Sequence, residues 1–84
     1  MYSVEYSGKA IKALQKMDKP VAAMLYGWIE KNLVNCTDPY KHGKALIGDK
    51  SGCWRYRVGA YRLITEIQEQ DVKIIIAHRR DVYK

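Results

Sequence analysis

All five arginines of this 84-residue chain lie in its second half. Residues 41–84 hold ten basic residues against five acidic ones, whereas residues 1–40 hold five against four. An arginine presents a planar fork of donors that matches two phosphate oxygens at once. A one-sided basic surface also steers association with polyanions and supplies much of the affinity for nucleic acid. The sequence therefore favours binding of phosphate, and first of all RNA phosphate. The arginines are Arg55, Arg57, Arg62, Arg79 and Arg80.

The residues around the first three arginines predict a β-hairpin. The dipeptide Gly59-Ala60 fits a two-residue loop with glycine at its first central position, which is the arrangement of a type II′ turn. This loop would place Arg57 directly opposite Arg62. One face of the hairpin then carries Arg55 with these two arginines. The other face belongs on the core and carries Trp54, Tyr56, Val58, Tyr61 and Leu63.

The predicted pairing of two arginines has a cost in stability. Like charges directly across a strand pair repel each other by about several tenths of a kcal/mol or more. An interpretation without a ligand is a solvated basic face on which Glu66 or Asp81 reduces the repulsion between the arginines. Three arginines on one face, beside a basic loop, favour anion binding over that interpretation. The loop carries Lys41, His42, Lys44 and Lys50.

The first half of the chain predicts one strand followed by two helices. Residues 2–6 alternate apolar and polar side chains, as a short half-buried strand does. Ser7 stands at an N-cap position for a helix through Met17, with Ile11, Leu14 and Met17 on its apolar face. A second helix follows Asp18-Lys19-Pro20 and runs to about Leu33. The short connection predicts an antiparallel helical hairpin.

The second half predicts a connecting segment and three strands. Residues 35–52 are rich in turn-forming residues, and strands are expected at about 53–58, 61–68 and 72–78. The apolar run in the last strand is typical of a central strand buried on both faces. The order β-α-α-β-β-β predicts a single α+β domain over residues 1–84, with the helical hairpin packed on a small, mainly antiparallel, twisted sheet.

Several classes of protein are disfavoured by composition. Cys36 and Cys53 lack metal-ligand spacing and are expected to be reduced, so we expect no metal and no cofactor. The N-terminus has neither a basic segment nor an apolar run, and no stretch reaches membrane-spanning length. We therefore expect a cytoplasmic protein without a membrane partner.

The chain resembles the RelE branch of the RelE/ParE superfamily of bacterial type II toxins. The resemblance covers essentially the whole chain. Its most specific parts are a strand motif at residues 52–59 and a terminal motif at residues 78–83. Relatives often have lysine at the positions of Arg55 and Arg57, and commonly have aspartate at the position of Ala60. The matching segments are residues 2–6, His42-Gly43-Lys44-Ala45-Leu46, Gly52-Cys53-Trp54-Arg55-Tyr56-Arg57-Val58-Gly59, Tyr61-Arg62-Leu63-Ile64 and His78-Arg79-Arg80-Asp81-Val82-Tyr83.

The resemblance implies a metal-independent, ribosome-dependent endoribonuclease that cuts mRNA in the A site and so inhibits translation. Its implied catalytic residues are Arg55, Arg57, Arg62, Arg79 and Tyr83. For the terminal arginine, Arg80 or His78 could take the place given to Arg79.

Chemistry and charge add roles to this implied site. Cleavage by the 2′-hydroxyl of RNA requires a base, an acid and stabilisation of charge at phosphorus. Surrounding arginines would lower the pKa of Tyr83 and favour it as the base. Residues expected to contact RNA without catalysis are Lys41, His42, Lys44, His78 and Arg80.

The resemblance also implies partners and leaves a second function open. The partners are a cognate RelB-like antitoxin, expected to be acidic and partly disordered, and the ribosome with its mRNA and rRNA. The alternative is a ParE-like toxin that poisons DNA gyrase by protein contact, or an RNA-binding module without catalysis. The tyrosine among arginines in the terminal motif favours the nuclease.

Overall fold

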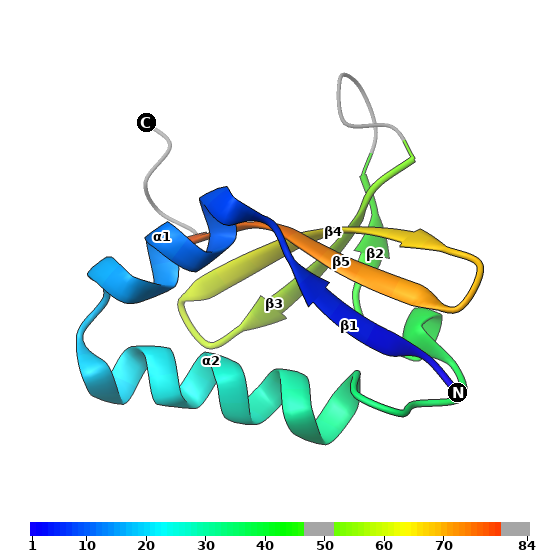
Figure 1. Ribbon diagram of the computed structural model, residues 1–84, viewed down its shortest axis with the longest axis horizontal. Helices are drawn as coiled ribbons and strands as arrows, with labels where there is room; N and C mark the ends of the chain where they lie inside the picture. The colour runs from blue at the N-terminus through cyan, green and yellow to red at the C-terminus, as the bar shows by residue number, and fades with distance from the viewer. Residues whose placement is uncertain (47–51, 80–84) are drawn as a thin grey trace.

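The computed structural model describes residues 1–46 and 52–79, and the residues described form a five-stranded sheet with two α-helices (Figure 1). The predicted α+β class and element order are confirmed, with one further short strand. The elements are β1 Ser3–Tyr6, α1 Gly8–Lys16, α2 Lys19–Asn32, the 3-10 helix η1 Pro39–Lys41, β2 Lys44–Ala45, β3 Trp54–Val58, β4 Tyr61–Gln68 and β5 Asp71–Arg79.

The strand order in the sheet is β1-β5-β4-β3-β2. β1 pairs with β5 in parallel, so the first and last of the described strands lie side by side although two α-helices and three strands separate them in the sequence. The remaining three strand pairs are antiparallel, so the mainly antiparallel sheet is confirmed. The expectation that 35–52 is only a connection is wrong, since this segment contains η1 and β2. A two-residue strand is too short to show a period of alternation.

Helix α1 begins where the sequence predicts. The Ser7 hydroxyl accepts a hydrogen bond from the Ala10 N–H (3.0 Å) and donates one to the Ile75 carbonyl (2.8 Å), so one side chain caps the helix and ties it to β5. The helix ends at Lys16, and Ala10 and Leu14 are its buried residues. Ile11, expected on the apolar face, is 40% exposed. The side of the helix that faces the sheet is therefore centred on Ala10 and Leu14 rather than on Ile11.

Helix α2 turns back along the sheet after a tight connection (Figure 1). Asp18 is its N-cap residue and Pro20 lies in its first turn, where a missing N–H costs nothing. Leu25 and Ile29 are buried, as the predicted apolar face requires. Both helices contribute to one hydrophobic core with the helix-facing side of the sheet. The core residues are Ala10, Leu14, Leu25, Ile29, Leu33, Tyr56, Val58, Leu63, Val72, Ile74 and Ala77.

The apolar run in β5 arises from a β-bulge and not, as predicted, from burial of the strand on both faces. Ile74 pairs with Thr65 and Ile76 pairs with Ile64, which leaves Ile75 as an extra residue at a β-bulge. Ile75 and Ile76 are only half-buried, so burial of this strand on both faces is wrong. The bulge, rather than a second covering layer, interrupts the alternation of apolar and polar residues.

Candidate nucleic-acid interface

The predicted hairpin between β3 and β4 is confirmed in its turn and in its register. Gly59 has a φ of +60°, whereas Ala60 has no positive φ, which is the distribution of a type II′ turn. Arg57 pairs with Arg62 and Arg55 pairs with Ile64. The two arginines therefore lie directly opposite each other across the strand pair.

The row of basic residues continues onto β5, where His78 pairs with Arg62 on its other side. Lys44 pairs with Arg55 in the neighbouring row. Strand alternation places these five side chains on the face of the sheet opposite the hydrophobic core. We call this surface the cation face, and its residues are Lys44, Arg55, Arg57, Arg62 and His78.

The cation face is partly rigid. Arg57 is exposed, whereas Arg55, Arg62 and His78 are half-buried, and the Nε atoms of Arg55 and Arg62 are buried. Ile64, directly opposite Arg55, is only 5% exposed although it lies on the same face. Neighbouring side chains must cover it, and the apolar stems of long basic residues are suited to do so. This arrangement limits the rotamers of two of the arginines before any anion arrives.

Side chains of β3 pin the loop before β2 from the core side. The Trp54 indole N–H donates to the His42 carbonyl (2.6 Å), and the Tyr56 hydroxyl donates to the Pro39 carbonyl (2.7 Å). Burial, and to a lesser degree Cys36, Tyr40 and Asp38, raises the pKa of Tyr56 far above its usual value near 10, so its hydroxyl stays a donor. These two bonds hold η1 and the residues after it against the sheet.

Gly43 lets that loop approach β3 closely. Its φ is +79°, and a Cβ there would lie 2.2 Å from the Arg55 carbonyl oxygen and 2.8 Å from Trp54 Nε1. Only glycine combines this conformation with this approach. Lys44 is thereby seated beside Arg55, so Gly43 supports the cation face without presenting a side chain to it.

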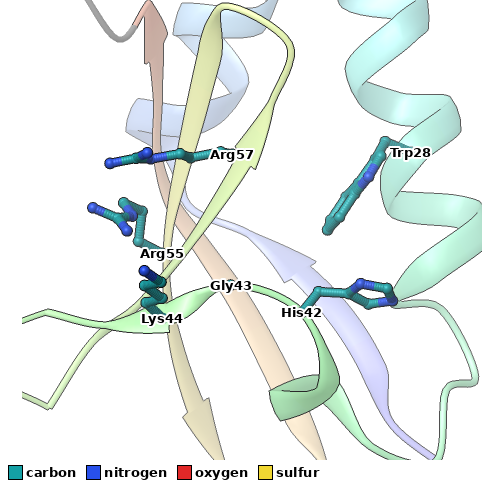
Figure 2. Close-up of a pocket in the computed structure, with 6 residues that line it drawn as sticks. All are labelled: Trp28, His42, Gly43, Lys44, Arg55 and Arg57. Atoms are coloured by element: carbon teal, nitrogen blue, oxygen red, sulfur yellow. The ribbon is translucent and has the colours of Figure 1, made fainter.

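A cleft of about 330 Å³ lies where this loop, the edge of β3 and α2 meet. Figure 2 shows the cation side chains on one side of β3 and two aromatic rings on the other, with Gly43 between them. The Trp28 ring lies 5.8 Å from the His42 ring, nearly edge to face at 70°. The lining residues are Trp28, His42, Gly43, Lys44, Arg55 and Arg57.

The structure separates some of the residues predicted for one site. Arg79 pairs with Tyr61, so alternation along β5 directs it toward the helix-facing side, and it is exposed at the strand end. His78, not Arg79, is the described residue of the terminal motif that extends the cation row. Lys41 is exposed on η1 and lines a different cleft, which it shares with His42. The predicted site residues Arg80 and Tyr83 lie outside the described residues.

Two lining residues of the cleft were not singled out from the sequence as site residues. Trp28 occupies the same helical spacing as the core residues Leu25 and Ile29, so periodicity alone assigns it to the core. Gly43 follows a histidine in a segment rich in turn residues, where one glycine is unremarkable by itself. A close approach of backbone to a neighbouring strand is visible only in three dimensions.

The arrangement can hold phosphate by electrostatics and hydrogen bonding. Guanidinium groups aimed from a fixed sheet can stabilise negative charge that develops on a bound phosphate. Among residues 1–46 and 52–79, no group of three or more His, Cys, Asp or Glu side chains is placed to hold a metal ion. In the same part of the chain, no helix is both long and apolar enough to cross a membrane.

Comparison with solved structures finds toxins bound to antitoxins. The structure is similar to a chain of the RelBE2 toxin–antitoxin complex of Mycobacterium tuberculosis, with 26% identity and a TM-score of 0.85 over 94% of this chain and 98% of that one. A chain of the RelE–RelB complex of Pyrococcus horikoshii OT3 is similar at 22% identity and a TM-score of 0.69, covering 96% and 97%. A chain of the intact RelBE complex of Escherichia coli is similar at 18% identity and a TM-score of 0.69, covering 96% and 99%.

Comparison of sequences gives the family. No curated protein matches the chain. The model of the family described as "ParE toxin of type II toxin-antitoxin system, parDE" matches residues 4–83, which is nearly the whole chain. The predicted superfamily is confirmed by this match together with the structural similarity. The chain belongs to the ParE toxin family of type II toxin–antitoxin systems, within the RelE/ParE superfamily, and its structure is that of a RelE-type toxin.

Proposed function

We propose that this toxin is a ribosome-dependent endoribonuclease that cuts mRNA in the A site. The observation that carries the proposal is the row Arg57, Arg62 and His78, which lie in register on three adjacent strands. The like charges of Arg57 and Arg62, directly opposite each other, destabilise the sheet, so a bound polyanion is the best physical reason for their retention. A phosphate over this row would meet donors from more than one strand.

The proposed reaction uses the RNA itself as nucleophile and needs no metal or cofactor. The 2′-oxygen attacks the adjacent phosphorus, a new P–O bond forms and the bond to the 5′-oxygen breaks. The products are a 2′,3′-cyclic phosphate and a 5′-hydroxyl. A base removes the 2′-proton, an acid protonates the leaving 5′-oxygen, and cations stabilise the charge on the phosphorane.

The residues of the cation face divide these tasks with the terminal motif. Arg57 and Arg62 hold the scissile phosphate, and Arg55 assists them. Tyr83 is assigned to accept the 2′-proton, because the arginines that precede it in the sequence would favour its ionised form. Arg79, Arg80 or His78 acts near the leaving group, and of these His78 is the one in register with Arg62.

Mapping of mRNA 5′ ends after pulsed expression tests this proposal. Codon-phased cuts that depend on ribosomes are expected from the wild-type toxin. Tyr83→Phe and Arg62→Ala should each reduce the rate of cleavage of ribosome-bound mRNA by about 10² or more, the size of effect found when a charge-stabilising or acid–base group is removed. Cleavage by Tyr83→Phe at the wild-type rate would remove Tyr83 from the chemistry.

The family match favours a second candidate function. The matching family is described by its ParE members, and a ParE-like toxin would poison DNA gyrase by protein contact. The same expression experiment separates the two candidates. DNA breaks without codon-phased mRNA cuts would support the gyrase toxin and exclude the nuclease.

Partners follow from the charge of the cation face. The similar solved structures include complexes with RelB antitoxins, and an acidic RelB-like antitoxin would neutralise this surface. In the cytoplasm the free toxin would meet the ribosome, where Lys44 of the cation face and Lys41 on η1 would contact RNA phosphate. Growth unaffected by loss of a small neighbouring acidic protein would count against the antitoxin.

A further inference from the structure

The cleft beside β3 combines aromatic rings with basic side chains, and a ligand that has both a flat ring and a negative charge would use both. Trp28 and His42 supply flat aromatic surfaces on one side of the strand (Figure 2). Lys44, Arg55 and Arg57 supply positive charge on the other. A free phosphate would need only the cations, and an apolar peptide would need only the rings.

The aromatic side of the cleft is held in place by the fold. The Trp28 ring packs 5.3 Å from the ring of the fully buried Tyr56, and the His42 backbone is fixed by the hydrogen bond from Trp54 (2.6 Å). The His42 ring in turn lies 5.8 Å from the Trp28 ring, so the two rings are positioned before a ligand binds. Preorganised rings lose little conformational entropy when a planar group stacks on them.

The cationic side of the cleft is continuous with the cation face, because Arg55 and Arg57 belong to both. A polyanion whose phosphates follow Arg57 and Arg62 would pass the mouth of the cleft. A volume of about 330 Å³ is at the small end of the range for small-molecule sites, about 300–1,000 Å³. This size suits one nucleotide and not a folded segment of a partner protein.

We propose that this cleft binds a single unstacked nucleotide of RNA, with its base against Trp28 and His42 and its phosphate at Lys44, Arg55 and Arg57. The proposal rests on the proposed function, since it makes the cleft a base-binding subsite beside the scissile phosphate. Stacking depends on the area of the π-face rather than on a hydrogen-bond code, so purines should bind better than pyrimidines. The nucleotide could come from mRNA or from rRNA, and the chemistry of recognition is the same.

Titration of the ¹⁵N-labelled full-length toxin with nucleoside 5′-monophosphates tests the cleft directly. Adenosine 5′-monophosphate should shift the Trp28 indole and His42 signals in a saturable way and bind about ten-fold more tightly than ribose 5-phosphate, which lacks the base. Equal affinities for these two ligands, or an unchanged Trp28 signal, would overturn the proposal.

Variants separate stacking from folding. Trp28→Leu should lower the affinity for adenosine 5′-monophosphate about ten-fold, to that of ribose 5-phosphate, whereas Trp28→Phe should retain most of it. Tyr26→Leu is the matched control, because Tyr26 is an exposed aromatic on the same helix that does not line the cleft. Tyr26→Leu with the same loss as Trp28→Leu would contradict the assignment. The wild-type titration decides the proposal even if Trp28→Leu does not fold.

Crosslinking on the ribosome identifies the source of the nucleotide. With 4-thiouridine placed only in the mRNA, a crosslink to the peptide containing Trp28 or His42 identifies mRNA, and a crosslink to unlabelled rRNA under short-wavelength light identifies rRNA. A Trp28 signal that responds to an antitoxin peptide but not to any nucleotide would overturn the proposal in favour of a protein ligand. Nucleotide binding without codon-phased mRNA cuts would retain the subsite and reject the nuclease.

Discussion

The two ends of the exposed sheet face carry charge in opposite ways. At one end Arg57, Arg62 and His78 lie in register on adjacent strands, and the like charges of the two arginines are neighbours. At the other end Lys73 lies between Glu5 of β1 and Glu66 of β4, and opposite charges alternate. We call this second surface the mixed face; Gln68 and Asp71 line the same hollow. Both faces belong to one sheet.

The difference shows where stability alone accounts for the sequence. Cross-strand pairs of opposite charge contribute roughly 0.2–1 kcal/mol, and like pairs cost a similar amount. The mixed face follows this rule and needs no ligand to explain it. The cation face violates the rule, while on the core side of the same strand Trp54 and Tyr56 hold the preceding loop by hydrogen bonds. Local violation of a stability rule is expected at functional sites.

Charge reversal at the cation face should give the largest effect. Arg57→Glu replaces a repulsive pair with an attractive one opposite Arg62, so the free energy of unfolding should rise by about 0.4–2 kcal/mol. Cleavage of ribosome-bound mRNA should fall by about 10² or more, because a cation is lost and an anion faces the phosphate. Urea denaturation and single-turnover cleavage measure the two effects. A variant that is both more stable and fully active would break the comparison between the two faces.

Substitution of Gly43 should give the next largest effect, on stability. Gly43→Ala forces a Cβ against the Arg55 carbonyl at a φ of +79°, so the free energy of unfolding should fall by about 2 kcal/mol or more. Urea denaturation measures the loss. Gly27→Ala is the control, because a Cβ there meets no atom within 4 Å, and helix propensity predicts a gain of about 0.5–1 kcal/mol. Equal stability of the two variants would show that the loop does not depend on close approach to β3.

Much of the cation face could be predicted from the sequence, because a two-residue loop fixes the register of every residue in its hairpin. Glycine at the first position of that loop places Arg57 opposite Arg62 without any knowledge of the fold. The mixed face could not be predicted in this way. Its pairing joins β1 to β5 in parallel across most of the chain, and no local turn encodes that register.

The cleft could not be predicted for a related reason. Trp28 and His42 come together only when α2 and the loop before β2 pack on the same sheet edge. The bulge at Ile75 likewise arises from the pairing between β4 and β5. It produces a continuous apolar run in the sequence, from which burial of β5 on both faces was wrongly predicted. Sequence patterns specify local periods and turns, whereas these features arise from tertiary contacts.

Removal of the Tyr56 hydroxyl should destabilise the protein by an intermediate amount. Tyr56→Phe leaves the carbonyl of the buried Pro39 without this donor, so the free energy of unfolding at neutral pH should fall by about 1–2 kcal/mol. Because burial raises the pKa of Tyr56, its contribution is complete below pH 10 and is lost as pH rises above that value. The gap between wild type and variant should therefore narrow above pH 10 in urea titrations. Tyr26→Phe, at an exposed tyrosine on α2, is the control, and a gap independent of alkaline pH would contradict this account.

Charge reversal at the mixed face should give the smallest effect on cleavage and the sharpest contrast with the cation face. Lys73→Glu puts three carboxylates in one row, with the new one between Glu5 and Glu66. Two attractive pairs become two repulsive ones, so the free energy of unfolding should fall by about 1 kcal/mol or more, and less at high salt. Cleavage of ribosome-bound mRNA should stay within about two-fold of wild type, because this end of the sheet lies beyond the cation row. Arg57→Glu and Lys73→Glu change the net charge by the same amount, so a difference between them reflects position and not total charge. If both variants lost cleavage equally, long-range attraction of the whole basic protein for RNA would explain the activity, and the cation face would have no special role.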